Sequence, residues 1–250
     1  MKAAVLAAGY GQRLRPITEK FPKAMVPVGG RPMIEYSLLL LKHYGIREIM
    51  INLHYLGEII EEHLKDGSKL GLKITYSREE ELLDTGGALL HTRPFLEKET
   101  FVVINSDVII DLSLSDLLEA HKKRHATATL VLRPDPEADR YGPIEVGRNL
   151  RIERFLGYEA PGRSRAPLSK LMFTGVQVLE PRVFAFLEAE SSLSSRRFSI
   201  TQAIYPKMLA QGEPLYGYRF DGFWQDLGTA ERIKEAESRL QRGQARLHYL

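Results

Sequence analysis

The chain has 250 residues, of which 44% are hydrophobic and 27% are charged, so it can bury one sizeable core. Its formal charge of only +3 argues against nucleic acid or a membrane surface as a partner. The absence of cysteine excludes disulfides and thiolate metal sites and makes a reducing cytoplasm the expected location. We expect neither a signal peptide nor a membrane span, because glycine and arginine interrupt the N-terminal apolar run at once.

Strand-like and helix-like segments alternate in the first half of the chain. Strands are expected at Lys2–Leu6, Glu48–Leu53, Lys73–Ser77 and Phe101–Asn105, and helices at Pro32–His43, Gly57–Leu64, Gly86–Leu90 and Ser113–His125. We expect Gly45 to end the first of these helices and Thr85 to be the N-cap of the third. This alternation predicts a mostly parallel sheet with helices on both faces.

The second half of the chain has more strands and fewer helices. Strands are expected at Thr127–Leu132, Tyr141–Val146, Leu150–Phe155 and Leu171–Leu179, helices at Ile200–Gln211 and Thr229–Arg242, and loops at Pro161–Pro167 and Ser191–Arg197. This half is therefore expected to form a mixed sheet or a small substrate-binding β extension. We find no internal repeat, and in particular no hexapeptide β-helix period.

The most informative segment is a glycine-bearing loop that follows the first strand. Its small residues, Ala7, Ala8, Gly9 and Gly11, allow backbone N–H groups to approach an anion closely. Two cations on the same loop, Arg13 and Lys23, can neutralise the charge of that anion. The combination predicts a polyphosphate ligand.

Three kinds of phosphate loop compete for this segment. Nothing matches a Walker A loop, and a dinucleotide fingerprint is disfavoured because bulky Leu14 stands at its third small position. The third kind is the nucleotide loop of the sugar-1-phosphate nucleotidylyltransferases, which the chain resembles over a long, gapless pattern. The matching residues are Leu6, Ala7, Ala8, Gly9, Gly11, Arg13, Leu14, Pro16, Thr18, Pro22, Lys23, Pro27 and Val28.

Two aspartates fit the same resemblance. Asp107 ends an apolar run, which places a carboxylate at the sheet edge where open α/β folds bind ligands. The segment Phe223–Thr229, FWQDLGT, resembles a second motif of the family and contains Asp226. The resemblance implies that both aspartates hold a catalytic Mg²⁺ and that Asp107 also belongs to the nucleotide site. The alternatives from the residues alone are an ordinary cap or turn at Asp107 and a helix cap at Thr229.

Other segments resemble the substrate contacts of the family. Thr85 and Gly86 match the segment that holds the base, although Asp84 replaces the usual glycine. Gly142 and Gly175 match two sugar-contacting segments, with turns or bulges as the plain alternative. The Glu-Lys pair that many relatives carry after a phenylalanine is missing here.

A replacement cation for the missing lysine could come from three residues, Lys170, Arg163 or Arg165, and the sequence does not choose among them. We retain Lys170 as the sugar-binding candidate.

The resemblance implies one Rossmann-like nucleotidyltransferase domain over residues 1–250, of the GT-A-like nucleotide-diphospho-sugar transferase fold. Its nucleotide-binding half would be about residues 1–125, its sugar-binding half about 126–228, and its last helix 229–242. The implied reaction joins a nucleoside triphosphate to a sugar 1-phosphate and releases pyrophosphate, with Arg13 and Lys23 as catalytic residues.

Among family members, the chain resembles the short mannose-1-phosphate guanylyl-, N-acetylmuramate-1-phosphate uridylyl- and glucose-1-phosphate thymidylyltransferases. Two other functions stay open: a non-catalytic nucleotide-sugar sensor and a nucleotide-sugar glycosyltransferase. The base, the sugar and any homo-oligomer also stay open.

Overall fold

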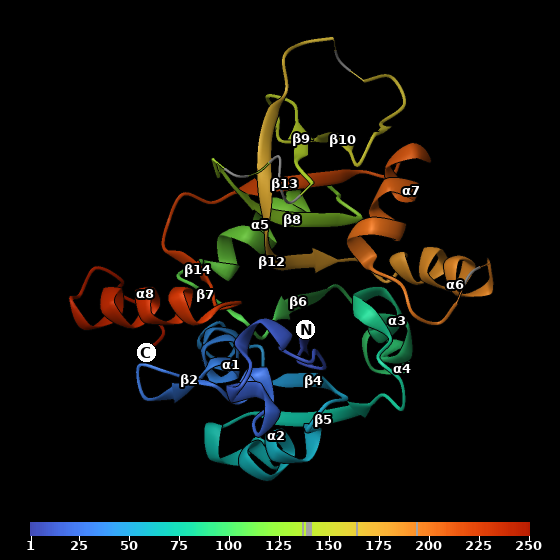
Figure 1. Cartoon of the computed structure of the whole chain (residues 1–250). Helices are drawn as coiled ribbons and strands as arrows, with labels where there is room; N and C mark the ends of the chain where they lie inside the picture. The colour runs from blue at the N-terminus through green and yellow to red at the C-terminus, as the bar shows by residue number, and fades with distance from the viewer. Residues whose placement is uncertain (137, 139–141, 164, 194) are drawn as a thin grey trace. The chain divides into compact units, whose positions relative to one another are not determined.

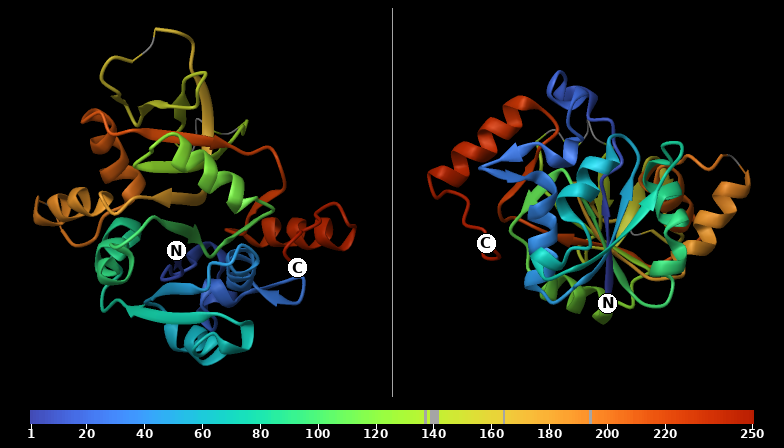
Figure 2. Two further views of the ribbon diagram at one scale, coloured as in Figure 1. Left: turned by 180° about the vertical axis from the view of Figure 1, so that it is seen from behind. Right: turned by 90° about the horizontal axis from the view of Figure 1, so that it is seen from below.

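The computed structural model describes residues 1–136, 138, 142–163, 165–193 and 195–250, which form two compact units (Figures 1 and 2). Unit 1 comprises Met1–Leu82, Ile104–Leu112 and Gly222–Leu250, and unit 2 comprises Leu83–Val103 and Ser113–Asp221. Each unit is thus assembled from separate stretches of chain. Unit 1 in particular depends on three segments that are distant in sequence.

Unit 1 is built on a parallel ladder. Its main elements are β1 (Lys2–Leu6), β2 (Pro27–Val28), β3 (Arg31–Pro32), α1 (Met33–His43), β4 (Glu48–Leu53), α2 (Gly57–Leu64), β5 (Lys73–Arg78), β7 (Val108–Ile110), β14 (Trp224–Asp226) and α8 (Ala230–Gln241). Strand β4 pairs in parallel with β1 on one side and with β5 on the other. Its residues after Glu48 are all buried, as expected for a strand covered on both faces.

The end of α1 shows how local chemistry fixes an element of unit 1. Gly45 has φ 75°, its N–H donates to Lys42 O at 2.9 Å, and the next N–H, of Ile46, donates to Leu41 O at 3.0 Å. These two bonds make the glycine-terminated Schellman motif, in which glycine accepts the left-handed conformation without a steric penalty. The predicted role of Gly45 is confirmed.

Unit 2 contains a mixed sheet. Its elements are α3 (Asp84–His91), α4 (Arg93–Leu96), most of β6 (Phe101–Asn105), α5 (Leu114–Lys123), β8 (Ala128–Arg133), β9 (Ile144–Val146), β10 (Ile152–Phe155), β11 (Tyr158–Glu159), β12 (Ser169–Leu179), α6 (Val183–Leu193), a π-helical turn (Ile200–Ile204), α7 (Tyr205–Ala210) and β13 (Leu215–Arg219). Strand β8 pairs antiparallel with β12 and parallel with β13, while β9, β10 and β11 extend the sheet through antiparallel pairs. The predicted α/β class, with a mixed sheet flanked by helices, is confirmed.

Three expectations for unit 2 need correction or restriction. The helix predicted over Ile200–Gln211 is a π-helical turn followed by α7, because Pro206 has no N–H to continue a regular helix. The loop predicted from Ser191 is wrong for its first residues, since α6 runs to Leu193. Tyr141, where one strand was expected to begin, lies outside the described residues, and β9 begins at Ile144.

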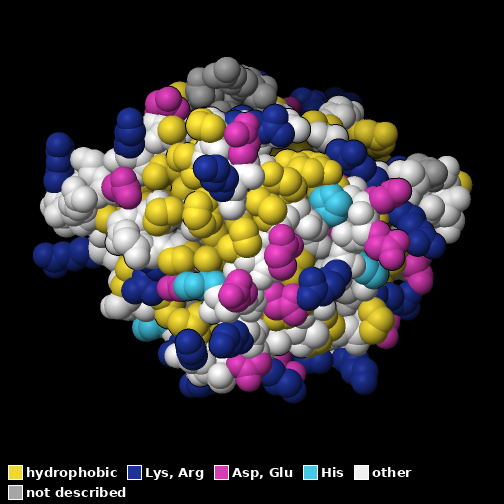
Figure 3. Space-filling model, turned by 60° about the horizontal axis from the view of Figure 1, so that its bottom comes forward, with side chains coloured by type: hydrophobic (Ala, Val, Ile, Leu, Met, Phe, Trp, Pro, Cys, Tyr) yellow, Lys and Arg dark blue, Asp and Glu magenta, His cyan; other side chains and the backbone are white. Residues whose placement is uncertain are grey.

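The surface agrees with the small net charge. On the face drawn in Figure 3, hydrophobic side chains gather near the centre, and basic and acidic side chains lie mostly around them. The presence of both signs is consistent with the formal charge of +3. Within the described part of the chain, no helix combines the length and the apolar character needed to cross a membrane.

Candidate active site

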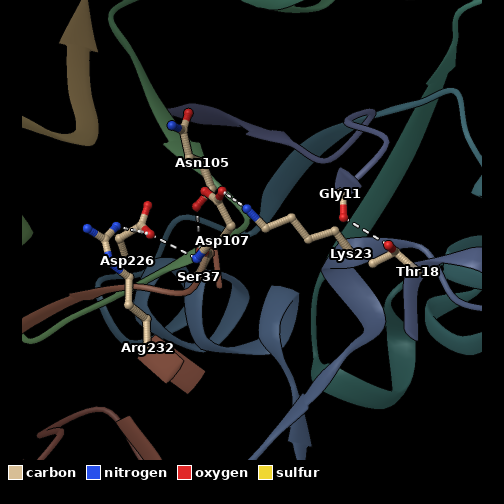
Figure 4. Close-up of polar contacts among 9 residues, drawn as sticks. Gly11, Thr18, Lys23, Ser37, Asn105, Asp107, Asp226 and Arg232 are labelled. Atoms are coloured by element: carbon tan, nitrogen blue, oxygen red, sulfur yellow. Dashed lines mark hydrogen bonds and ion pairs between the residues drawn. The ribbon is translucent and has the colours of Figure 1, made fainter. Parts of the chain in front are cut away.

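A short antiparallel ladder in unit 1 brings Asp107 and Asp226 together. Asp107 immediately precedes β7, and Asp226 is the last residue of β14. The two strands pair so that Asp226 lies opposite Val108, and the N–H of Leu227 donates to the backbone oxygen of Asp107 at 2.9 Å. Two carboxylates from distant parts of the sequence therefore stand on neighbouring backbone positions (Figure 4).

Each of these carboxylates is bonded to a cation. Lys23 Nζ donates to Asp107 Oδ2, and Arg232 Nη1 donates to Asp226 Oδ1 at 2.6 Å (Figure 4). The four side chains are between 14% and 32% exposed. They are thus more sheltered from water and salt than ordinary surface ion pairs, which contribute little because both screen them.

Arg13 lies beside the second carboxylate. A Cβ atom added to Gly228 would stand 2.7 Å from Arg13 Nη2 and 2.7 Å from Asp226 Oδ1. The N–H of Gly228 donates to the same Asp226 oxygen at 2.8 Å. Gly228 therefore lets the guanidinium of Arg13 pack against backbone next to Asp226. The structure brings both predicted catalytic cations and both predicted metal ligands into unit 1.

The loop that carries Arg13 and Lys23 is closed by specific contacts. Gly11 has φ 64°, and a Cβ atom there would stand 2.9 Å from both Lys23 Cβ and Thr18 Cγ2. Thr18 is buried, and its hydroxyl donates to Gly11 O at 2.8 Å. Leu14 is also buried, so its side chain anchors the loop to the core. Glycine at position 11 is thus required both by the backbone conformation and by the close approach of Lys23.

The start of the loop is held by two residues that the sequence analysis did not single out. Asn52, in β4, accepts the N–H of Ala7 at 2.7 Å and donates to Glu79 Oε1 at 2.7 Å. Both of these polar side chains are buried. The available signals were a polar residue, Asn52, inside the apolar run of β4 and a carboxylate, Glu79, directly after β5.

The N–H of Ala7 is therefore already bonded within the protein. By contrast, the described residues provide no acceptor for the N–H groups of Ala8 and Gly9. Leu6, the other predicted residue of this segment, is the last residue of β1.

The predicted base-binding residues lie in unit 2 and are tightly packed there. Helix α3 begins at Asp84, so the prediction of Thr85 as its N-cap is wrong; the Thr85 hydroxyl instead accepts the N–H of Ile200 at 3.0 Å. The N–H of Gly86 donates to Phe198 O at 2.8 Å, and a Cβ atom at Gly86 would collide with the Phe198 ring. Asp84 has φ 59°, a left-handed conformation that explains why glycine is usual at this position.

The predicted sugar-binding residues also lie in unit 2. Gly142 and Gly175 have φ 75° and 88°, and Gly175 falls within a register shift between β12 and β8. Lys170, exposed on β12, lies opposite Glu145 of β9. The positive φ values of Gly142 and Gly175 favour glycine at both positions whether or not they contact a sugar.

The two aspartates fit one kind of metal site. Among the described residues, no group of three or more His, Asp or Glu side chains is placed to hold a metal ion. Mg²⁺ does not need such a cage, because it usually binds one or two carboxylates together with substrate phosphates and water. Asp107 and Asp226 supply hard oxygen ligands of this kind, so the donor set suits Mg²⁺ that arrives with a phosphate ligand.

Arg232 is a third site residue that the sequence analysis missed. It lies in the first turn of α8, six positions after Asp226. The available signal was a basic residue close behind the second aspartate at the start of a predicted helix, where an acidic residue is the more favourable choice for the helix dipole.

Comparisons with known proteins place the chain in a family. Residues 2–243 match the family described as Nucleotidyl transferase. The UTP–glucose-1-phosphate uridylyltransferase of Synechocystis sp. is 34% identical over 91% of this chain and 60% of its own length. Mannose-1-phosphate guanylyltransferase 1 of Arabidopsis thaliana is 35% identical over 91% of this chain and 61% of its own length. The chain belongs to the nucleotidyl transferase family, and it spans about three fifths of these curated relatives.

A solved structure shows the same fold. A Bacillus anthracis protein with the provisional name glucose-1-phosphate thymidylyltransferase, solved with sucrose, superimposes with a TM-score of 0.82 at 26% identity. The match covers 95% of this chain and 94% of that one. The expected resemblance to sugar-1-phosphate nucleotidylyltransferases is confirmed.

Proposed function

We propose that the chain transfers a nucleoside monophosphate from a nucleoside triphosphate to a sugar 1-phosphate and releases pyrophosphate. The observation that carries the proposal is the cluster in unit 1, where Arg13, Lys23, Asp107 and Asp226 lie on the phosphate loop and the β7–β14 ladder. The relatives named above are nucleotidylyltransferases that act on glucose 1-phosphate and mannose 1-phosphate, which supports the same reaction class.

The reaction needs no side-chain nucleophile. An oxygen of the sugar phosphate forms a bond to the α-phosphorus of the triphosphate, while the bond from that phosphorus to the bridging oxygen breaks. The electron pair of the broken bond leaves with pyrophosphate. Because the attacking phosphate is already an anion, catalysis consists of bringing two polyanions together and stabilising the charge on the transferring phosphoryl group.

The residues of unit 1 suit that task. Arg13 and Lys23 would neutralise phosphate oxygens, and the N–H groups of Ala8 and Gly9 would bond to them. Asp107 and Asp226 would hold Mg²⁺, which neutralises phosphate charge when bound. Lys23 is bonded to Asp107 in this structure, and its ammonium group has further N–H donors that could bond to a phosphate oxygen.

We further propose that the nucleotide is bound by about residues 1–125 and the sugar by about residues 126–228. Thr85 and Gly86 remain the proposed contacts to the base, and Gly142, Gly175 and Lys170 to the sugar. The Glu-Lys pair of many relatives is missing here, and Lys170 is the proposed replacement cation. Lys170 is exposed, so its side chain could contact the phosphate of the sugar. The proposed compartment is the cytoplasm, as the absence of cysteine suggests.

The test is pyrophosphate release from a matrix of five nucleoside triphosphates and several hexose 1-phosphates. The proposal expects release that depends on both substrates and on Mg²⁺, with one preferred pair. A glycosyltransferase would consume a nucleotide sugar without releasing pyrophosphate. A sensor would bind a nucleotide sugar without turnover, and either result would overturn the proposal.

Arg13→Ala tests the role of the loop. If Arg13 stabilises the transition state, the variant loses roughly 10²–10³-fold in kcat with a smaller change in KM. Arg15→Ala is the matched control, because Arg15 is also exposed and lies on the same loop. Unchanged turnover in Arg13→Ala would remove Arg13 from the mechanism.

A further inference from the structure

Arg232 is placed against Asp226 by the start of helix α8. Thr229 is the N-cap of this helix, and its hydroxyl accepts the N–H of Arg232 at 3.4 Å. Side chains on a helix lean toward its N-terminus, so the guanidinium of Arg232 points back toward the end of β14. It meets Asp226 there, as Figure 4 shows. The cap and the helix direction together make this contact a built feature.

Asp226 is consequently well supplied with donors before any metal is bound. Its Oδ1 atom accepts the Arg232 guanidinium at 2.6 Å and the Gly228 N–H at 2.8 Å. A divalent cation on Asp226 would meet a positive charge already bonded to the same carboxylate. The two cations would repel each other across that carboxylate. Arg232 therefore opposes the binding of a metal ion that arrives alone.

A polyphosphate ligand changes that balance. A guanidinium group binds phosphate oxygens through two parallel N–H bonds at least as well as it binds a carboxylate. When phosphate lies near Asp226, Arg232 can exchange its carboxylate partner for phosphate, and the carboxylate becomes available to the metal. Arg13, beside the same carboxylate, adds to the attraction for phosphate.

We propose that Arg232 is a positioning residue that occupies Asp226 at rest and makes tight metal binding depend on the presence of polyphosphate. The proposal rests on the proposed function, because it takes Asp226 as a metal ligand. Because Arg232 occupies the carboxylate, replacing it with an uncharged residue should raise the affinity of the site for a metal ion. Replacing a metal ligand would instead lower that affinity.

A second arginine on the same helix provides a matched control. Arg239 Nη2 forms an ion pair with Glu235 Oε1 at 2.7 Å, one helical turn apart, and its side chain is 43% exposed. It thus resembles Arg232 in charge and in helical context but pairs with a residue outside the site. Arg239→Gln removes a cation from α8 without touching Asp226.

The experiment measures Mn²⁺ binding to the whole chain by the electron paramagnetic resonance signal of free Mn²⁺, with and without inorganic pyrophosphate. Arg232→Gln is expected to bind Mn²⁺ alone roughly ten-fold more tightly than the wild type, the low end of the effects of outer-sphere partners on metal affinity. Pyrophosphate should raise Mn²⁺ affinity strongly in the wild type and much less in the variant. By linkage, Mn²⁺ should raise pyrophosphate affinity by the same factors.

Further variants make each outcome decisive. Arg232→Lys keeps a positive charge and should fall between wild type and Arg232→Gln, which also covers the case in which Arg232→Gln does not fold. Arg239→Gln should match the wild type. If neither Arg232 variant binds Mn²⁺ more tightly than the wild type, the inference is overturned. If Asp226→Asn leaves Mn²⁺ binding unchanged, the metal site itself, and with it that part of the proposed function, is wrong.

Discussion

Unit 1 gathers two carboxylates and the cations Arg13, Lys23 and Arg232 at a loop and the ends of short strands, where all are partly exposed. Unit 2 instead contains a buried ionisable group, His121, that is bonded within the protein. There, His121 is buried on α5, with Nδ1 2.8 Å from the hydroxyl of Thr129 and Nε2 3.1 Å from Glu180 Oε1. Because a carboxylate can only accept, Nε2 carries the proton and Nδ1 accepts the hydroxyl hydrogen.

The outer strands of unit 2 show a second arrangement of charge. Lys170 lies opposite Glu145, Glu145 opposite Arg154, and Arg154 opposite Glu159, so the sign alternates across β12, β9, β10 and β11. Arg154 bonds to both glutamates. The alternation avoids the repulsion that like charges directly opposite each other would cause.

The two units differ in whether their charged groups can change bonding partners. In the proposed reaction, each ion pair of unit 1 would exchange one partner for phosphate or metal. In unit 2, the buried network has no such exchange available, since breaking it leaves a buried polar group without a partner. Changes to these charged groups are therefore expected to affect function in unit 1, and stability at the buried network of unit 2.

The largest effect is expected from Asp226→Asn or Asp107→Asn. Each change removes half of the carboxylate charge that would hold Mg²⁺, and turnover in the proposed reaction should fall on the order of 10²–10³-fold. Steady-state pyrophosphate release measures it. Asp221→Asn is the control, because Asp221 is 61% exposed and pairs with Arg219 in unit 2. Equal losses in Asp221→Asn and Asp226→Asn would break the proposed division between the units.

Gly11→Ala should destabilise unit 1 through the phosphate loop. Its left-handed φ and the 2.9 Å approach of Lys23 Cβ and Thr18 Cγ2 together predict a loss of about 2 kcal/mol in the free energy of unfolding. Urea denaturation measures the loss. Gly9→Ala is the control on the same loop, since a Cβ atom at Gly9 would meet nothing within 4 Å. If both variants were equally stable, the loop would not be held as tightly as its contacts indicate.

The pH dependence of stability should reveal the buried network of unit 2. Burial lowers the pKa of His121 below its ordinary value of 6.5. As the pH falls below about 6.5, the unfolded chain gains this proton first, so the free energy of unfolding falls until the folded pKa is reached. Above 6.5 this group contributes no pH dependence.

Thermal unfolding between pH 8 and pH 5 measures the effect, and His121→Gln should flatten the part of the slope below pH 6.5. His125→Gln, at an exposed position, should leave that slope unchanged. A wild-type slope in His121→Gln would show that His121 does not titrate differently in the folded and unfolded states.

The smallest effect is expected from Arg154→Ala in the outer strands of unit 2. Its ion pair with Glu159, in which the two side chains are 35% and 46% exposed, faces water. Salt screens this pair, and the ordering of two long side chains opposes it. We expect no resolvable change in the midpoint of urea denaturation at about 0.15 M salt. A clear drop in the midpoint would mean that the alternating charges act as a network that stabilises the sheet.

Much of the fold could be predicted because its signals are local. Strands β1, β4 and β6 and helix α2 have the predicted bounds, since continuous apolar runs and helical spacing are read directly from neighbouring residues. Helix α6 was missed because its serine- and glutamate-rich end looks polar. The short strands β7 and β14 were missed because three residues carry too little pattern.

The sequence by itself determined the α/β class, the phosphate loop, and the two aspartates and two loop cations that resemble a nucleotidylyltransferase site. The tertiary structure decided which groups meet. Asp107 and Asp226 become neighbours only through the β7–β14 ladder, and Arg232 reaches Asp226 only because Thr229 caps the helix between them. Pairing between distant segments depends on the burial of the whole core rather than on the residues that pair, so no single stretch of sequence carries that information.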